Sequence, residues 1–125
     1  MNLELSLILA KSVSSNGGQA NYRGLAKVEK GAKNAVTHVA CNSLILDGES
    51  GANTYPAMEI HEDKVKATHE ATTGKIEEDQ LFYLQSRGIP RQKAKKMIVS
   101  GFADPILKHL PTKHAMEMER LMEIC

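Results

Sequence analysis

The sequence predicts a mainly β fold that ends in a group of helices. Apolar and polar residues alternate in short stretches up to about residue 75, and glycine and asparagine separate these stretches. After Gly74 the apolar residues recur every three to four positions instead. Alternation is typical of strands, whereas the wider spacing is typical of amphipathic helices. The change of period therefore divides the chain into β structure over residues 1–75 and helices over residues 76–125.

The strands are expected where apolar and polar residues alternate. These stretches lie at residues 3–7, 25–29, 36–40, 43–46 and 57–60, with a further strand-like segment at residues 65–67. Glycine and asparagine at their ends indicate tight turns.

A weak internal repeat relates two of the glycine turns. The segment GAKN at residues 31–34 recurs as GANT at residues 51–54, an offset of 20 residues that also overlays Leu25 on Ile45 and Ile45 on Val65. A period of ~20 residues favours stacked coils, in which each coil buries its apolar face against the next. An antiparallel β-sandwich with similar turns fits the same pattern. The residues alone leave both architectures open.

Four helices are expected in the second part of the chain. They are predicted at residues 77–87, 90–102 and 106–110, and from Thr112 onward. Glu78 and Asp79 place negative charge at the start of the first helix, where the helix dipole favours it. Gly88 is expected to end that helix, and Asp104 and Pro105 to start the third.

Composition and charge exclude several classes of protein. A chain of 125 residues fits a single domain. A formal net charge of +1 argues against nucleic-acid binding through bulk electrostatics. Two cysteines, Cys41 and Cys125, exclude a disulfide framework and an all-cysteine metal cage within one chain. No secretory signal and no apolar run long enough to span a bilayer are present, so we expect a cytoplasmic protein with free thiols.

Cys41 and the pair His69-Glu70 are the candidates for chemistry. A lone cysteine is most often a small buried hydrophobe, but its thiolate can also be a nucleophile or a soft ligand. An imidazole next to a carboxylate can bind metal, although neighbours on a strand face opposite ways. Glu59, His61, Glu62 and Asp63 resemble a metal cluster by composition, and alternation would put all but Glu62 on one face, but most such charged runs are solvated turns.

No signature of an enzyme is present. The sequence has no P-loop, no dinucleotide fingerprint and no nucleophile elbow. A hydrolase that uses Cys41 and His69 lacks an evident orienting group and oxyanion hole. We therefore expect a protein without catalytic residues.

Five segments resemble a known family. They are YRGL at residues 22–25, CNSLIL at 41–46, THEATTGKI at 68–76, EDQLFYLQSRGI at 78–89 and IVSGF at 98–102. These segments are similar to the C-terminal core of SufB and SufD, the scaffold proteins of the SUF system of iron–sulfur cluster assembly. The resemblance runs from about residue 12 to about residue 107, and its FYLxSRGI string is long and specific.

The resemblance implies a fold and partners. The fold would be a right-handed parallel β-helix followed by a small helical subdomain that docks SufC, an ABC-type ATPase. The helices at 77–87 and 90–102 would dock it, through Leu81, Phe82, Tyr83, Arg87, Ile98 and Phe102. A SufB/SufD-type partner or a second copy of the chain would complete the assembly. Family members are far longer, so the chain is either a short form or a fragment.

The resemblance also implies a site. Cys41 matches the family's sulfur-accepting cysteine, and His69 and Glu70 match the His-Glu pair that acts with it on a transient iron–sulfur cluster. SufD proteins usually have His-Gly at this pair, so Glu70 is SufB-like, whereas residues 63–66 are closer to SufD; the subtype stays open. We therefore expect a non-catalytic scaffold that accepts sulfur or iron at a shared site. The alternative is an interaction module that binds the ATPase without a cluster.

Overall fold

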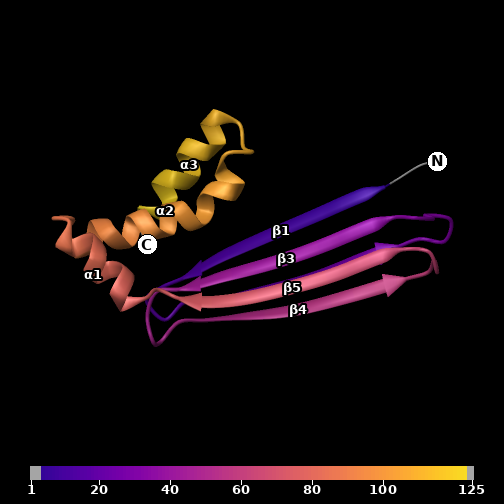
Figure 1. Ribbon diagram of the computed structural model, residues 1–125, viewed down its shortest axis with the longest axis horizontal. Coiled ribbons are helices and arrows are strands. Elements are labelled where there is room, and N and C mark those ends of the chain that lie inside the picture. Colours follow the sequence, from indigo (N-terminus) through magenta and orange to yellow (C-terminus); the bar gives the residue numbers. More distant parts are fainter. Residues whose placement is uncertain (1–3, 124–125) are drawn as a thin grey trace.

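The computed structural model describes residues 4–123 and shows an elongated stack of strands with helices at one end (Figure 1). The strands are β1 (Leu5–Ser14), β2 (Gln19–Val28), β3 (Val36–Ile45), β4 (Gly51–Ile60) and β5 (Lys66–Lys75). The helices that follow are α1 (Glu78–Ser86), α2 (Arg91–Leu107) and α3 (Thr112–Met122). The predicted order of β structure followed by helices is therefore confirmed.

The strands form two parallel sheets that the chain visits in turn. One sheet has the order β1-β3-β5 and the other the order β2-β4, and every pair of neighbouring strands is parallel. Each turn of the chain therefore adds one strand to each sheet, as in a β-helix (Figure 1). The antiparallel β-sandwich, which the sequence had left open, is wrong.

The predicted period of 20 residues is also wrong. Strand pairing joins residues 31 apart at Ser12 and Ser43, 30 apart at His38 and Thr68, and 32 apart at Asn21 and Asn53. Each coil contains two ten-residue strands and two turns, which needs more than 20 residues. The two Gly-Ala motifs are not equivalent positions of the coil. Gly31 lies in a turn, whereas Gly51 is the first residue of β4.

The strands are longer and fewer than the alternating stretches predicted. The stretches 36–40 and 43–46 belong to one strand, β3, because Cys41 and Asn42 continue the alternation between them. Along β3 the side chains of Thr37, Val39 and Cys41 are buried while those between them are half-buried. The buried residues face the inside of the coils, so the core there is narrow and built from small and medium side chains.

The helices largely agree with the prediction, with one correction. α1 ends as predicted at Gly88, whose φ of 85° is left-handed, and the amides of Gly88 and Ile89 return to the carbonyls of Gln85 and Leu84. The predicted break at Pro105 is wrong, because α2 continues through it to Leu107. Pro105 has no N–H to donate to the carbonyl of Gly101, but Leu107 is buried, which holds the last turn in place.

The helices lie where β1, β3 and β5 end (Figure 1). Leu81 of α1 and Ala94 of α2 are fully buried and form the centre of a second core. The ammonium of Lys11 on β1 lies 4.2 Å from the ring centroid of Phe102 and ties α2 to the sheet. No helix within residues 4–123 is long and apolar enough to cross a membrane.

Candidate functional site

Cys41 and His69 meet inside the coils. Cys41 lies on β3 and His69 on the neighbouring strand β5, where His69 pairs with Val39. Because the strands are parallel and in register, residues 39, 41 and 69 share the inner face. The Cys41 Sγ is 3.7 Å from the His69 Nε2, which is hydrogen-bonding distance for sulfur. The structure therefore brings together two of the predicted site residues.

Cys41 is held in a buried environment. Its side chain is 3% exposed, and this burial raises the pKa of the thiol, whereas the side chain of Tyr22 on β2 hydrogen-bonds the thiol and opposes that rise. Burial raises a thiol pKa because the charged thiolate loses solvation. A cation bound to the sulfur would replace the proton, since metals bind thiolates rather than thiols.

Glu70 lies on the opposite face of β5 from His69. Its carboxylate Oε2 is 4.0 Å from the Nε2 of His38, and the Glu70 side chain is 60% exposed. The Nδ1 of the same His38 lies 2.6 Å from the Oγ1 of Thr68. The structure therefore separates Glu70 from Cys41 and joins it to an outer-face group of His38 and Thr68.

Neither cluster of predicted ligands forms a complete metal site. Within residues 4–123 no group of three or more histidine, cysteine or acidic side chains is placed to hold a metal ion. In the run Glu59-His61-Asp63, the Glu59 Oε2 is 3.8 Å from the His61 Nε2, and both side chains are about half exposed. β4 ends at Ile60, so the alternation expected to align these side chains stops there. Cys125 lies outside the described residues.

A cavity adjoins the thiol of Cys41. It measures about 160 Å³, and its inner-face lining carries hydroxyl groups. The lining residues are Ala10, Lys11, Ser12, Ala20, Asn21, Tyr22, Cys41, Asn42, Ser43, Asn53 and Thr54. The hydroxyl of Ser12 donates to that of Ser43 at 2.8 Å, which satisfies two of these polar groups. The buried sulfur therefore has space beside it inside the coils.

The predicted docking residues occupy two different places. Phe82 and Tyr83 are exposed on α1, and Arg87 is exposed directly after it, with its guanidinium 5.3 Å from the Tyr83 ring centroid. Ile98 and Phe102 instead line a recess of about 470 Å³ between the helices and Leu44 of β3. Leu81 is fully buried and presents no surface to a partner.

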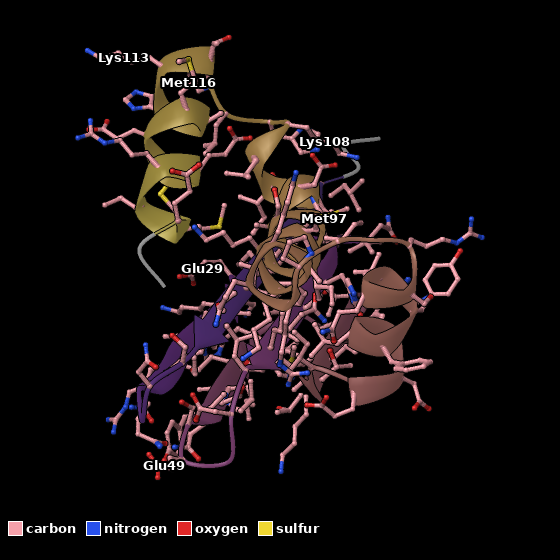
Figure 2. All side chains as sticks on the ribbon, turned by 90° about the vertical axis from the view of Figure 1, so that its left-hand side faces the viewer. Glu29, Glu49, Met97, Lys108, Lys113 and Met116 are labelled. Atoms are coloured by element: carbon pink, nitrogen blue, oxygen red, sulfur yellow. The ribbon has the colours of Figure 1, made fainter. Side chains whose placement is uncertain are left out.

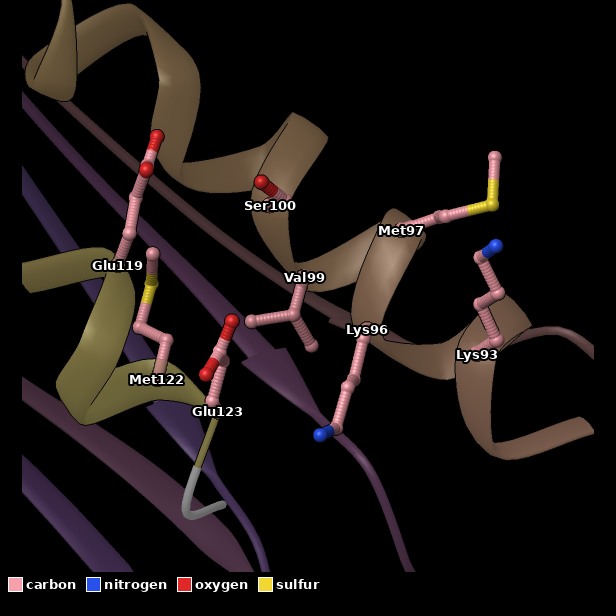
Figure 3. Close-up of a pocket in the computed structure, with 8 residues that line it drawn as sticks. All are labelled: Lys93, Lys96, Met97, Val99, Ser100, Glu119, Met122 and Glu123. Atoms are coloured by element: carbon pink, nitrogen blue, oxygen red, sulfur yellow. The ribbon is translucent and has the colours of Figure 1, made fainter. Parts of the chain in front are cut away.

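A second recess lies between α2 and α3 (Figure 3). It measures about 370 Å³. Its lining includes two basic residues of α2, Lys93 and Lys96, and two acidic residues, Glu119 and Glu123. Met97 and Met122 supply apolar surface there. Figure 2 places Met116 and Lys113 on α3 away from the strands. None of these residues is a cysteine or histidine, so this recess is chemically unlike the Cys41 site.

Sequence reasoning missed Tyr22 and His38 as members of these groups. Tyr22 was noticed only as part of the YRGL string, and its partner Cys41 is on another strand. The true coil length would have found His38, because a step of about 30 residues places it beside Thr68. The incorrect 20-residue period concealed this arrangement.

The comparisons with known proteins identify a family. Residues 5–102 match the family model described as SUF system FeS cluster assembly, SufBD core domain. The chain is 47% identical over 119 residues to an iron–sulfur cluster assembly SufBD family protein of Mycobacterium tuberculosis, covering 95% of this chain and 14% of that protein. It is 46% identical over 118 residues to a protein of the same description from Staphylococcus aureus, covering 94% of this chain and 25% of that protein.

A stack of parallel coils followed by helices, with a buried cysteine beside a histidine, thus coincides with the matched segment. The chain belongs to the SufBD family of iron–sulfur cluster assembly proteins. It spans between about a seventh and a quarter of the length of the curated relatives it matches.

Proposed function

We propose that this chain is part of a non-catalytic scaffold that accepts sulfur or iron at Cys41 during iron–sulfur cluster assembly. The observation that carries the proposal is the 3.7 Å contact between the Cys41 Sγ and the His69 Nε2 inside the coils. Thiolate is a soft ligand suited to iron–sulfur species, and imidazole is the commonest nitrogen ligand in proteins. The cluster is the cargo of this site.

The cavity beside Cys41 supports the same proposal. Its 160 Å³ gives a sulfur atom or an iron ion room next to the thiol. Sulfur acceptance would be attack by the Cys41 thiolate on the outer sulfur of a donor persulfide. The donor would leave as a thiolate, and Cys41 would become the persulfide, so no other oxidant or reductant is needed.

We further propose that a second protein chain completes the site. An iron–sulfur cluster is commonly held by four protein ligands, and Cys41 and His69 supply two. The Glu70 side chain is 60% exposed on the outer face of β5, so another chain can reach its carboxylate. A SufB/SufD-type partner or a second copy would supply the missing ligands, with Glu70 as a harder ligand at the junction.

Docking of a SufC-type ABC ATPase is the second part of the proposal. It rests on the family resemblance and on the exposed aromatic surface of α1. Phe82 is 73% exposed and Tyr83 is 56% exposed, and aromatic side chains with a nearby arginine are typical of energetically important contacts. Ile98 and Phe102 would act indirectly, by holding α2 against the strands.

Anaerobic reconstitution with ferrous iron and sulfide tests the cargo site. The parent chain, Cys41→Ser and Cys125→Ser would be compared for bound iron and for sulfur-to-iron charge-transfer absorbance. We expect Cys41→Ser to lose most of both, and Cys125→Ser, which removes the other thiol, to retain both. Equal iron and equal absorbance in the parent and Cys41→Ser would show that the assignment is wrong.

The alternative function is an interaction module that binds the ATPase without carrying a cluster. The exposed surface of α1 favours it independently of Cys41. It predicts that the parent takes up no cluster, and that ATPase capture survives a triple variant with Cys41→Ser, His69→Ala and Glu70→Ala. Cluster uptake by the parent that this triple variant abolishes would exclude it.

A further inference from the structure

Tyr22 lies at the boundary between two internal spaces of different character. It is on the inner face of β2 and lines the 160 Å³ cavity next to Cys41. It also lines a smaller cavity of about 10 Å³ next to His69, which holds no more than about one water. Among the residues that line these two cavities, Tyr22 is shared by both.

The two spaces differ in chemistry. The larger one is lined by residues that carry hydroxyl groups, among them Ser12, Ser43 and Thr54. The smaller one is walled mainly by apolar groups, including Ile8 and Met58. The contact between Cys41 and His69 joins residues from the two sides of this boundary. Tyr22 therefore lies next to both the Cys41 side and the His69 side of this contact.

Gly24 determines where the Tyr22 side chain can lie. The two residues are two apart on β2, so they share the inner face. A Cβ at position 24 would lie 2.7 Å from the Cζ of Tyr22 and would collide with its hydroxyl. The absence of a side chain at Gly24 thus lets the Tyr22 ring lie along its own strand, with the hydroxyl over Gly24.

Tyr22 and Cys41 line the same cavity, and the side chain of Tyr22 is a hydrogen-bond partner of the thiol. This hydrogen bond lowers the pKa of the thiol, against the larger raising effect of burial. A phenol donates one hydrogen bond whose direction its ring fixes, so it restrains the sulfur that accepts it. Hydrogen bonds to ligand sulfur are known to tune the electronic properties of iron–sulfur centres.

We propose that Tyr22 is a positioning residue for Cys41. Its hydroxyl, held over Gly24, keeps the Cys41 sulfur beside His69 and at the wall of the polar cavity. The role rests on the proposed function of Cys41, because it concerns the same sulfur. It assigns to β2 a direct part in a site whose ligands come from β3 and β5.

The test uses the full 125-residue chain and anaerobic reconstitution with ferrous iron and sulfide. The variants are Tyr22→Phe, which removes the hydroxyl and keeps the ring, and Tyr55→Phe as a matched control. Tyr55 is exposed on β4 and its ring lies 5.1 Å from the Arg23 guanidinium. Cys41→Ser provides the baseline without the acceptor sulfur.

We expect Tyr22→Phe to shift the sulfur-to-iron charge-transfer band to longer wavelength, because a sulfur that has lost a hydrogen bond donates electrons more readily. Its iron affinity should fall about threefold to tenfold, as expected for one lost hydrogen bond. Tyr55→Phe should match the parent in both. A merely structural role for Tyr22 would lower the amount of cluster without moving the band.

Two results would overturn the proposal in distinguishable ways. If Cys41→Ser differs from the parent while Tyr22→Phe matches it in band position and affinity, Tyr22 has no positioning role and the Cys41 assignment stands. If Cys41→Ser matches the parent, the proposed function itself fails, and the role of Tyr22 fails with it.

A second variant keeps the test decisive if Tyr22→Phe does not fold. Site-specific replacement of Tyr22 by 3-fluorotyrosine preserves the ring and strengthens the hydroxyl as a donor. We expect the charge-transfer band to move to shorter wavelength, opposite to the shift in Tyr22→Phe. An unchanged band in the fluorinated chain would overturn the proposal.

Discussion

The inner and outer faces of β3 and β5 each carry a histidine, but in very different surroundings. On the inner face His69 meets the buried thiol of Cys41 at 3.7 Å. On the outer face His38 lies 2.6 Å from the Thr68 hydroxyl and 4.0 Å from the exposed carboxylate of Glu70. The difference shows that successive positions on a strand place their side chains in different surroundings, one inside the coils and the next on the outer face.

The consequence is clearest for the His69-Glu70 pair. The two residues are adjacent in sequence, yet one faces a sulfur inside the coils and the other faces solvent. A motif read as one site is therefore two half-sites on opposite faces of an edge strand. Two adjacent residues of α1 also differ in burial, and substitution of the buried one is expected to have the largest effect on stability.

Leu81 and Phe82 extend the comparison from strand to helix. Leu81 is fully buried and Phe82 is 73% exposed. Leu81→Ala should lower the free energy of unfolding by about 2–5 kcal/mol, because it leaves a cavity in the helical core. Phe82→Ala should change it by less than about 0.5 kcal/mol. Urea denaturation of the two variants measures both effects.

Phe82, unlike the buried Leu81, is available to bind a partner. If α1 docks the ATPase, Phe82→Ala should weaken that binding about tenfold or more while the chain stays folded. Titration of the purified ATPase onto the folded variant measures this loss. Unchanged ATPase binding in Phe82→Ala would remove α1 from the proposed interface.

The two histidines provide the next contrast. His69→Ala removes the imidazole beside Cys41 and should lower iron affinity in anaerobic reconstitution by about tenfold or more. His38→Ala removes the outer-face imidazole and should leave iron affinity within about twofold of the parent, since it does not contact the thiol. Iron titration followed by charge-transfer absorbance compares them. Equal losses in the two variants would mean that the faces are not functionally distinct.

The sequence predicted some features because local chemistry determines them. Gly88 ends α1 since only a left-handed residue completes that helix terminus, and glycine adopts it without cost. The pairing of Cys41 with His69 entered through family resemblance rather than through the repeat. The residues themselves predicted the fold class, because the change of period near residue 75 is a local signal.

Other features depend on contacts between distant residues and escaped prediction. The coil length is set by two strands and two turns together, so a short repeated motif did not reveal it. Pro105 was expected to break a helix, but burial of Leu107 holds the last turn. Tyr22 reaches Cys41 across the inside of the coils, and no spacing along one strand indicates that contact.

The smallest effect is expected at the junction of α1 and α2. Arg91 donates two hydrogen bonds to the Glu78 carboxylate, at 2.9 and 2.7 Å, and these bonds hold the pKa of Glu78 below its ordinary value. The same contact raises the pKa of Arg91. A carboxyl with a lowered pKa stabilises the folded state above its unfolded pKa, ~4.3 for glutamate, and loses that contribution as pH falls through its folded pKa.

The two side chains are 43% and 73% exposed, so solvent screens the pair and its contribution is modest. Glu78→Gln and Arg91→Gln should each lower stability slightly at neutral pH, and the double variant should lose no more than either one. The difference between the parent and Glu78→Gln should vanish in acid, where the parent carboxyl is also neutral. Thermal unfolding from neutral to acidic pH follows this convergence. A difference that persists in acid would show that the contribution of Glu78 does not come from its charge.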